Sequence, residues 1–254
     1  MQRETNPVAV AIAIEGLTKD YGDIRAVDDL NLTVSEAEVF GLLGPNGSGK
    51  TTTINCLTGL LSPTKGSIKV GGFDVRGEVE KAREIMGVSP QETAVCPYLT
   101  GRENVQLFGE LYSVPKQALR ARADNVMEKV GLIDDADRRV SKYSGGMKRR
   151  VSIAMALVTD PKIVLLDEPT VGMDPQARRE VWDFVVELRD RGKTVLLTTH
   201  YMEEAEELCD RVGIIDHGKL IALGSPAELK TKYGARDLED VFLQLTGRRI
   251  REGA

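Results

Sequence analysis

The chain has 254 residues, of which 41% are hydrophobic and 29% charged, and its formal net charge is -5. This composition is that of a folded globular protein, and it excludes a disordered or fibrous chain. The negative charge argues against a general nucleic-acid surface, so we expect no nucleic acid among the partners. No apolar run approaches the roughly 20 residues that span a bilayer. We therefore expect a soluble protein whose contacts with a membrane are made through a partner.

The predicted elements begin with β-strands. Alternating apolar residues predict strands over 9–14 and 26–34, and one slip in the second alternation indicates a bulged or edge strand. Between them we expect a loop that carries Tyr21. A fully apolar run over 39–43 predicts a buried strand, and apolar residues at helical spacing predict a helix over 51–61.

Three shorter elements follow. Turn residues bound a short strand over 67–70, a helix is predicted over 78–83, and an apolar strand over 85–89 comes next. Gln91 stands where this last strand runs out into a loop.

A helical insertion over 97–140 separates two α/β parts of the chain. Thr100 caps its first predicted helix, and Glu103 completes a capping box three residues later. A stripe of apolar residues at helical spacing predicts a second, charged helix over 116–130.

Helices and strands alternate through the rest of the chain. The sequence predicts a helix opened by residues 143–148 and ended by Pro161, strands over 163–166, 194–199, 211–215 and 219–222, helices that begin at Asp174 and Ser225, helices over 202–208 and 237–245, and a basic tail over 246–254. Strands that alternate with helices in this way predict an α/β fold with a parallel sheet.

Residues 44–51 read GPNGSGKT, which matches the phosphate-loop pattern GxxxxGK[ST]. Glycines let consecutive backbone N–H groups point inward, and the N-terminus of the following helix adds a positive partial charge. Lys50 would reach the β- and γ-phosphates of a nucleotide, and the Thr51 hydroxyl would hold Mg²⁺. The alternative is a flexible Gly/Ser loop before an ordinary helix. The apolar strand before the loop and the helix after it favour the phosphate site.

Polar side chains also follow three further apolar strands, at Gln91, at Asp167 with Glu168, and at His200. In a doubly wound sheet the carboxyl ends of parallel strands share one edge, where ligands bind. We therefore expect these residues to meet the phosphate loop. Asp167 would accept from Mg²⁺-bound water, and Glu168 would polarise the attacking water.

Each of these assignments has a plainer alternative. An Asp-Glu pair is often a solvated acidic turn, and a lone histidine is often structural, but their places after apolar strands favour function. Tyr21 would stack on adenine, although its spacing alone favours an ordinary turn tyrosine. The run Ser144-Gly145-Gly146 is either a glycine-rich helix cap or a second anion site. A second anion site implies either two ligands or the nucleotide of another subunit.

These motifs, in this order, resemble the nucleotide-binding subunit of an ABC transporter over about residues 8–230. The resemblance implies a P-loop core with a parallel sheet, an N-terminal antiparallel β subdomain and a helical subdomain over about 97–158. Residues 143–147 are similar to the signature motif, with Tyr143 and Met147 in place of the usual Leu and Gln, and residues 171–174 are similar to the D-loop. The resemblance also implies ATP, Mg²⁺ and a head-to-tail homodimer in which each signature motif closes over the partner's ATP.

The site residues that follow from the pattern and the resemblance fall into three groups. Catalysis is assigned to Lys50, Gln91, Glu168 and His200; nucleotide binding to Tyr21, Gly44, Pro45, Asn46, Gly47, Ser48, Gly49, Lys50, Thr51, Thr52, Ser144, Gly145, Gly146 and Asp174; and the metal to Thr51, Gln91 and Asp167.

The C-terminal part, 231–254, is predicted to be an amphipathic helix and a basic tail. Residues 237–247 are similar to the C-terminus of the daunorubicin/doxorubicin-resistance type of drug-export ATPase. That resemblance implies an ATPase that powers export of a drug, antibiotic or lipid-like substrate through a separate multi-span permease, at the cytoplasmic face of the cell membrane.

Two other functions were weighed. A soluble ABC ATPase that remodels ribosome or DNA complexes usually has two cassettes or a long coiled coil, and this chain has one cassette and no long heptad run. A regulatory subunit without turnover is disfavoured by the intact set of Asp167, Glu168 and His200.

Overall fold

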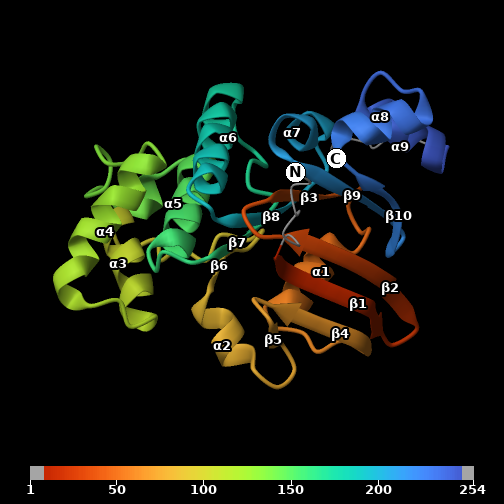
Figure 1. The fold of residues 1–254 in the computed structure, drawn as a ribbon. Helices are drawn as coiled ribbons and strands as arrows, with labels where there is room; N and C mark the ends of the chain where they lie inside the picture. Colours follow the sequence, from red (N-terminus) through yellow and green to blue (C-terminus); the bar gives the residue numbers. More distant parts are fainter. Residues whose placement is uncertain (1–8, 248–254) are drawn as a thin grey trace, which may run out of the picture.

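Two β-sheets and the helices around them make up residues 9–247, which the computed structural model describes (Figure 1). The first sheet is antiparallel, in the order β2-β1-β4-β5. Its strands are β1 (Val10–Tyr21), β2 (Ile24–Ser35), β4 (Lys65–Val70) and β5 (Phe73–Asp74). The predicted antiparallel N-terminal part is thereby confirmed.

The second sheet is mostly parallel, in the order β10-β9-β3-β8-β7-β6. Its strands are β3 (Val39–Leu43), β6 (Met86–Ser89), β7 (Ile163–Asp167), β8 (Thr194–Thr199), β9 (Arg211–Asp216) and β10 (Lys219–Gly224). Only β10 runs antiparallel to its neighbour. The fold is therefore α/β with the predicted parallel core.

The predicted loop that carries Tyr21 is shorter than expected. Tyr21 is the last residue of β1, which pairs with β2 up to the contact between Tyr21 and Ile24, and only residues 22–23 form the turn. A shift in register between Ile14 and Leu17 accommodates Gly16, whose φ is 60°. This bulge lets the strand continue past a glycine that reads as a break. The bulged edge strand predicted from the slip in alternation is confirmed as β2.

Nine α-helices surround the sheets within the described residues. They are α1 (Lys50–Leu57), α2 (Val79–Glu84), α3 (Gly101–Leu111), α4 (Lys116–Lys129), α5 (Gly145–Leu157), α6 (Pro175–Asp190), α7 (Met202–Leu208), α8 (Pro226–Tyr233) and α9 (Leu238–Thr246). A short 3-10 helix, Val140–Lys142, precedes α5. Helix α1 ends earlier than predicted, because Gly59 adopts a φ of 67° just beyond its end.

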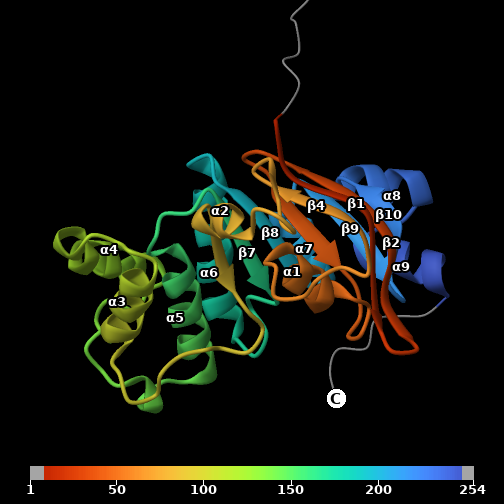
Figure 2. The same ribbon diagram turned by 90° about the horizontal axis from the view of Figure 1, so that it is seen from below.

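Helices α3, α4 and α5 form a helical lobe at one end of the molecule, away from the antiparallel sheet (Figures 1 and 2). The capping box of α3 is confirmed: Thr100 Oγ1 accepts from Glu103 N, and Glu103 Oε2 accepts from Thr100 N. Asp174 caps α6 as predicted, with Pro175 at the first helical position.

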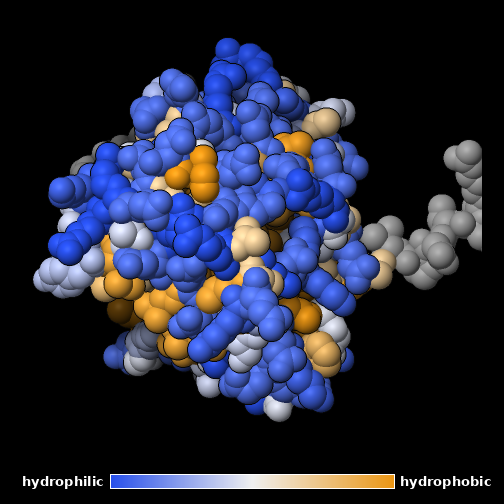
Figure 3. All heavy atoms as spheres, turned by 90° about the vertical axis from the view of Figure 1, so that its left-hand side faces the viewer, coloured by the Kyte–Doolittle hydropathy of each residue, from blue (hydrophilic) through white to orange (hydrophobic). Residues whose placement is uncertain are grey.

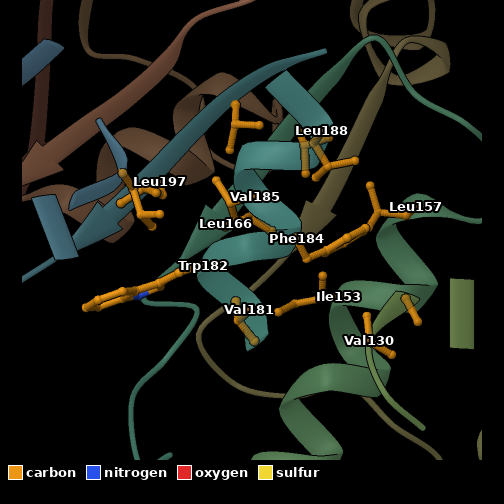
Figure 4. Packing of buried hydrophobic residues seen from close by; sticks show 14 of the residues in the cluster. Val130, Ile153, Leu157, Leu166, Val181, Trp182, Phe184, Val185, Leu188 and Leu197 are labelled. Carbon is orange, nitrogen blue, oxygen red and sulfur yellow. The ribbon is translucent and has the colours of Figure 1, made fainter. Parts of the chain in front are cut away.

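A continuous core joins the helical lobe to the parallel sheet through α6. In Figure 4, Phe184 of α6 lies beside Ile153 and Leu157 of α5, while Leu166 and Leu197 come from strands β7 and β8. A second core lies under the antiparallel sheet and packs against α1. Burial of these apolar surfaces, at roughly 25 cal/mol per Å², is the main source of stability.

Helix α9 adds to the same core. Leu238, Val241 and Phe242 are buried in the cluster that also contains Leu208 of α7 and Leu229 of α8. The amphipathic character predicted for this segment is therefore satisfied within the chain. Residues 248–254 of the predicted basic tail lie outside the described residues.

We predict that Thr100→Ala lowers the free energy of unfolding by about 1 kcal/mol, because the Glu103 N–H at the start of α3 loses its acceptor, Thr100 Oγ1. Urea denaturation measures this change. Thr231→Ala, at an exposed interior position of α8, is the matched control and should change stability by less than about 0.5 kcal/mol. Equal losses in both variants would contradict the capping role.

Candidate functional site

The loop between β3 and α1 follows the path expected of a phosphate loop. Gly49 precedes α1 with a φ of 105°, and a Cβ there would lie 2.4 Å from Ala26 O. Only glycine fits this position, because both the backbone conformation and the space exclude a side chain. A pocket of about 300 Å³ opens over the loop. It is lined by Ala26, Asn46, Gly47, Gly49, Lys50, Thr51, Thr52, Gln91 and Glu168.

The Lys50 ammonium is buried among oxygen atoms. Its Nζ donates to Gly44 O at 2.8 Å and to Pro45 O at 3.0 Å, and it lies 3.3 Å from Glu168 Oε1. Burial lowers the pKa of Lys50, and the negative charge of Glu168 offsets part of that effect. The Lys50 ammonium therefore lies between the backbone of the loop and the Glu168 side chain, at the wall of the pocket.

Glu168 has an unusual backbone conformation directly after β7. Its φ is 51°, in the left-handed region that few residues other than glycine occupy. Its N–H donates to Thr198 O at 3.1 Å and to Thr198 Oγ1 at 3.0 Å, both on the neighbouring strand β8. These bonds hold a conformation that costs about 1–3 kcal/mol, which is typical of functional sites.

The Glu168 carboxylate is 5% exposed and is held by three side chains. Oε1 lies 3.2 Å from His200 Nδ1 and 3.3 Å from Lys50 Nζ, and Oε2 accepts from Gln91 Nε2 at 3.3 Å. Burial raises the pKa of this carboxyl, but the hydrogen bond with His200 and the charge of Lys50 outweigh burial and bring the pKa below its ordinary value. Glu168 is therefore ionised at neutral pH. The structure brings together four residues that sequence reasoning placed on one sheet edge.

Hard oxygen atoms gather beside this carboxylate. Thr51 Oγ1 lies 3.4 Å from Gln91 Oε1, and the buried carboxylate of Asp167 accepts from Thr198 Oγ1. Hydroxyl, amide and carboxylate oxygens are the ligands that Mg²⁺ takes in nucleotide sites. Ser48 Oγ, in the loop itself, is buried without a hydrogen-bond partner among residues 9–247. Both observations fit a site that holds a nucleotide with its metal.

Arg149 is a central residue that the sequence reasoning missed. From α5 its guanidinium donates to the carbonyl oxygens of Pro90, Gln91, Asp167 and Pro169. One buried side chain thus ties the turn after β6 to the turn after β7. Helical spacing gave a signal for it, because Ser152, Ile153 and Ala156, three, four and seven residues on, are all buried. Thr198, a polar residue in an apolar strand, was missed in the same way.

The second glycine-rich turn does not reach this pocket. Ser144 caps α5, its Oγ accepting from Met147 N at 3.2 Å, and Ser144 and Gly145 are exposed. A Cβ on Gly146 would lie 3.6 Å from Met173, just before the α6 cap Asp174. Hence residues 144–146, Asp174 and the half-exposed Tyr21 are absent from the lining of the phosphate-loop pocket.

The two unusual signature residues make local contacts. Tyr143 is buried and its hydroxyl donates to Asp135 O at 2.5 Å. The Arg138 guanidinium lies 5.1 Å from the centre of the Tyr143 ring, and its Nη2 is 3.3 Å from Met147 Sδ. The larger side chains are thus accommodated beside the turn without filling it.

The comparisons with known proteins agree with this architecture. The family described as "ABC transporter" matches residues 27–171. A curated relative, the daunorubicin resistance ATP-binding protein DrrA3 of Streptomyces coeruleorubidus, is 46% identical over 237 residues, which cover 93% of this chain and 75% of the relative.

Two solved structures are similar in fold. An ATP-binding subunit of an ABC transporter has a TM-score of 0.84 and 27% identity, with 93% of this chain and 99% of that chain covered. The cassette MJ0796, as a dimer in a post-hydrolysis state with ADP and Pi, has a TM-score of 0.78 and 28% identity, with 84% and 98% covered.

The chain belongs to the ABC transporter family, and within it to the ATPases that bind and hydrolyse ATP for transport. In sequence it is similar to ATPases named for daunorubicin resistance. Within residues 9–247, none of the helices has both the length and the apolar composition needed to cross a bilayer.

We predict that Arg149→Lys lowers the free energy of unfolding by at least about 2 kcal/mol, because an ammonium cannot satisfy four carbonyl groups. Turnover of ATP should fall about tenfold, since the turns of Gln91 and Glu168 lose their common anchor. Urea denaturation and a phosphate-release assay measure the two effects.

Arg179→Lys provides the control, because Arg179 is exposed on α6. We expect both its stability and its turnover to match the unsubstituted protein. An Arg149→Lys variant that behaved like this control would show that the four carbonyl groups do not depend on the guanidinium.

Proposed function

We propose that this chain is the ATPase subunit of an exporter and drives a drug, antibiotic or lipid-like substrate through a separate multi-span permease. The observation that carries the ATPase chemistry is that Lys50, Gln91 and Glu168 line one 300 Å³ pocket and that His200 contacts Glu168 from beside it. The choice of substrate class rests on the similarity to the daunorubicin resistance protein.

The proposed chemistry assigns a task to each group. Backbone N–H groups within residues 46–49 and the N-terminus of α1 bind the phosphates, and Lys50 neutralises charge on the β- and γ-phosphates. Glu168, ionised at neutral pH, orients the attacking water and accepts its proton. His200 holds Oε1 of Glu168 at 3.2 Å and so fixes the direction of that carboxylate.

We further propose that Thr51, Gln91 and Asp167 hold Mg²⁺ with the nucleotide. Their oxygens fit this ion, because Mg²⁺ takes oxygen ligands and is usually bound through one or two carboxylates together with substrate phosphates and water. When bound, the ion neutralises charge that develops on the phosphate oxygens. Gln91 Nε2 also donates to Glu168, so one side chain touches both the metal ligands and the general base.

The exposed turn at residues 144–146 supports a head-to-tail homodimer. Free N–H groups at the start of α5 form an anion site that the chain's own phosphate-loop pocket does not use. In the proposed dimer this turn closes over the partner's ATP, and Asp174 at the start of α6 lies at the same interface. The dimeric cassette with ADP and Pi is a relative in which two such chains associate.

The proposed permease contact is a groove of about 280 Å³. Helix α2 and strand β6 lie on one side of it, and helices α3 and α5 on the other. Leu60 and Tyr112 line it, and Leu60 is 68% exposed. Leu111, next to Tyr112, is 70% exposed, and Figure 3 shows an apolar band across the lower part of this face. Apolar surface of this kind is typical of a protein–protein contact. In this proposal the permease holds the chain at the cytoplasmic face of the cell membrane.

We also propose a division of the chain at about residue 230. Residues 8–230 would be the ABC ATPase domain, with a helical subdomain over about 97–158, and residues 231–254 the C-terminal helix and tail. The packing of α9 on α7 and α8 supports a C-terminal segment that braces the ATPase domain instead of contacting substrate.

We predict that Glu168→Gln binds ATP but does not hydrolyse it, because the amide cannot accept the proton of water. The trapped ATP should then hold two chains together. Size-exclusion chromatography with light scattering, in ATP and Mg²⁺, measures the shift from monomer to dimer, and a phosphate assay measures the loss of turnover.

The control combines Glu168→Gln with Ser144→Arg, which fills the exposed turn of the signature motif. This double variant should bind ATP as a monomer, because the partner's phosphates can no longer enter the turn. A Glu168→Gln protein that remains monomeric, or a double variant that still dimerises, would refute the shared ATP site.

We predict that a C-terminally tagged chain, purified from its own membranes in mild detergent, brings down a multi-span protein in equal amount. Leu111→Asp should abolish this association, because it places a charge on the exposed apolar surface beside the groove. Leu223→Asp, on the partly exposed strand β10, serves as the control and should retain the partner. Recovery of ribosomal or DNA-repair proteins in place of a membrane protein would support the soluble remodelling ATPase.

A further inference from the structure

Glu204 is a buried acid that the chemistry described above does not use. It lies in the first turn of α7, four residues after His200, and its side chain is 0% exposed. Its Oε1 accepts from Thr170 Oγ1 at 2.8 Å and from Trp182 Nε1 at 3.0 Å. One oxygen atom therefore joins three segments that are distant in the sequence.

One of these segments adjoins Glu168, and another is helix α6. Thr170 stands two residues after Glu168. The backbone N–H of the next residue, Val171, donates to Glu168 O. Trp182 belongs to α6, the helix that Asp174 caps. Glu204 thus connects the turn of the proposed general base with the helix that begins beside the signature turn.

The same α7 turn also supports His200. The His200 ring packs on Tyr201, with 4.2 Å between the ring centres. The Arg178 guanidinium, on α6, lies 4.8 Å from the centre of the Tyr201 ring on the same side of this cluster. A displacement of α6 relative to α7 would therefore move His200, which contacts Glu168 Oε1, and the turn that carries Glu168.

Burial makes Glu204 an unfavourable choice for stability alone. Desolvation raises its pKa, and the hydrogen bonds from Thr170 and Trp182 offset only part of that effect. An apolar side chain of similar size would fill the same space without this cost. The acceptor oxygen, which an apolar residue lacks, is what the carboxyl group contributes.

We propose that Glu204 is a positioning residue that holds the Glu168 turn and His200 in a fixed position relative to α6. This inference rests on the proposed role of Glu168 in hydrolysis. Through Glu204, a movement of α6 at the dimer interface reaches the base that activates water. ATP binding is a separate property, because Glu204 touches none of the residues that line the phosphate-loop pocket.

The test compares Glu204→Gln with Glu204→Leu in steady-state ATP hydrolysis. Glutamine keeps the Oε1 acceptor and the volume, so kcat should stay within about twofold of the unsubstituted protein. Leucine removes the acceptor, so kcat should fall at least about tenfold while KM for ATP changes less than about threefold. A Leu variant with unchanged kcat, or equal losses in Gln and Leu, would overturn the proposal.

A further variant separates positioning from folding. Thr170→Val removes the donor beside Glu168 and should reproduce most of the kcat loss. Full turnover in Thr170→Val would overturn the proposal even if Glu204→Leu did not fold. Glu168→Gln is assayed in parallel: if it still turns over ATP, the proposed base is wrong, and that result is distinct from an effect of Glu204.

Discussion

The common edge at which β3, β6, β7 and β8 end is the constraint on which this structure depends. Parallel pairing puts the carboxyl end of each strand on the same side, so the residues after the strands meet without any local sequence signal. The Glu168 carboxylate is where they converge, within 3.3 Å of Lys50, His200 and Gln91. These three side chains, which come from three other segments, therefore orient the Glu168 carboxylate.

Two buried polar side chains hold the turns at that edge in place. Arg149 satisfies carbonyl groups of the turns after β6 and β7, and Glu204 accepts hydrogen bonds from the segment after Glu168 and from α6. Both are buried ionisable groups: burial lowers the pKa of Arg149 and raises the pKa of Glu204. They approach the Glu168 turn from different helices, α5 and α7.

The sequence predicted the strand ends well because they depend on local pattern and on one topological rule. It predicted the caps at Thr100 and Asp174 because capping chemistry is local. It did not predict the hydrogen bonds of Arg149 or Thr198, because those partners come from segments distant in sequence. The extension of β1 through Gly16 was missed because pairing with β2 overrides a local break. The roles of Ser144 and Asp174 depend on a second copy of the chain and stay predictions.

The continuous core through α6 has a consequence for how the protein unfolds. Phe184, Val185 and Leu188 share one apolar cluster with side chains of the helical lobe and of strands β7 and β8. Losing the lobe would expose the sheet, and losing the sheet would expose the lobe. The stabilities of the helical lobe and of the parallel sheet are therefore thermodynamically coupled through α6.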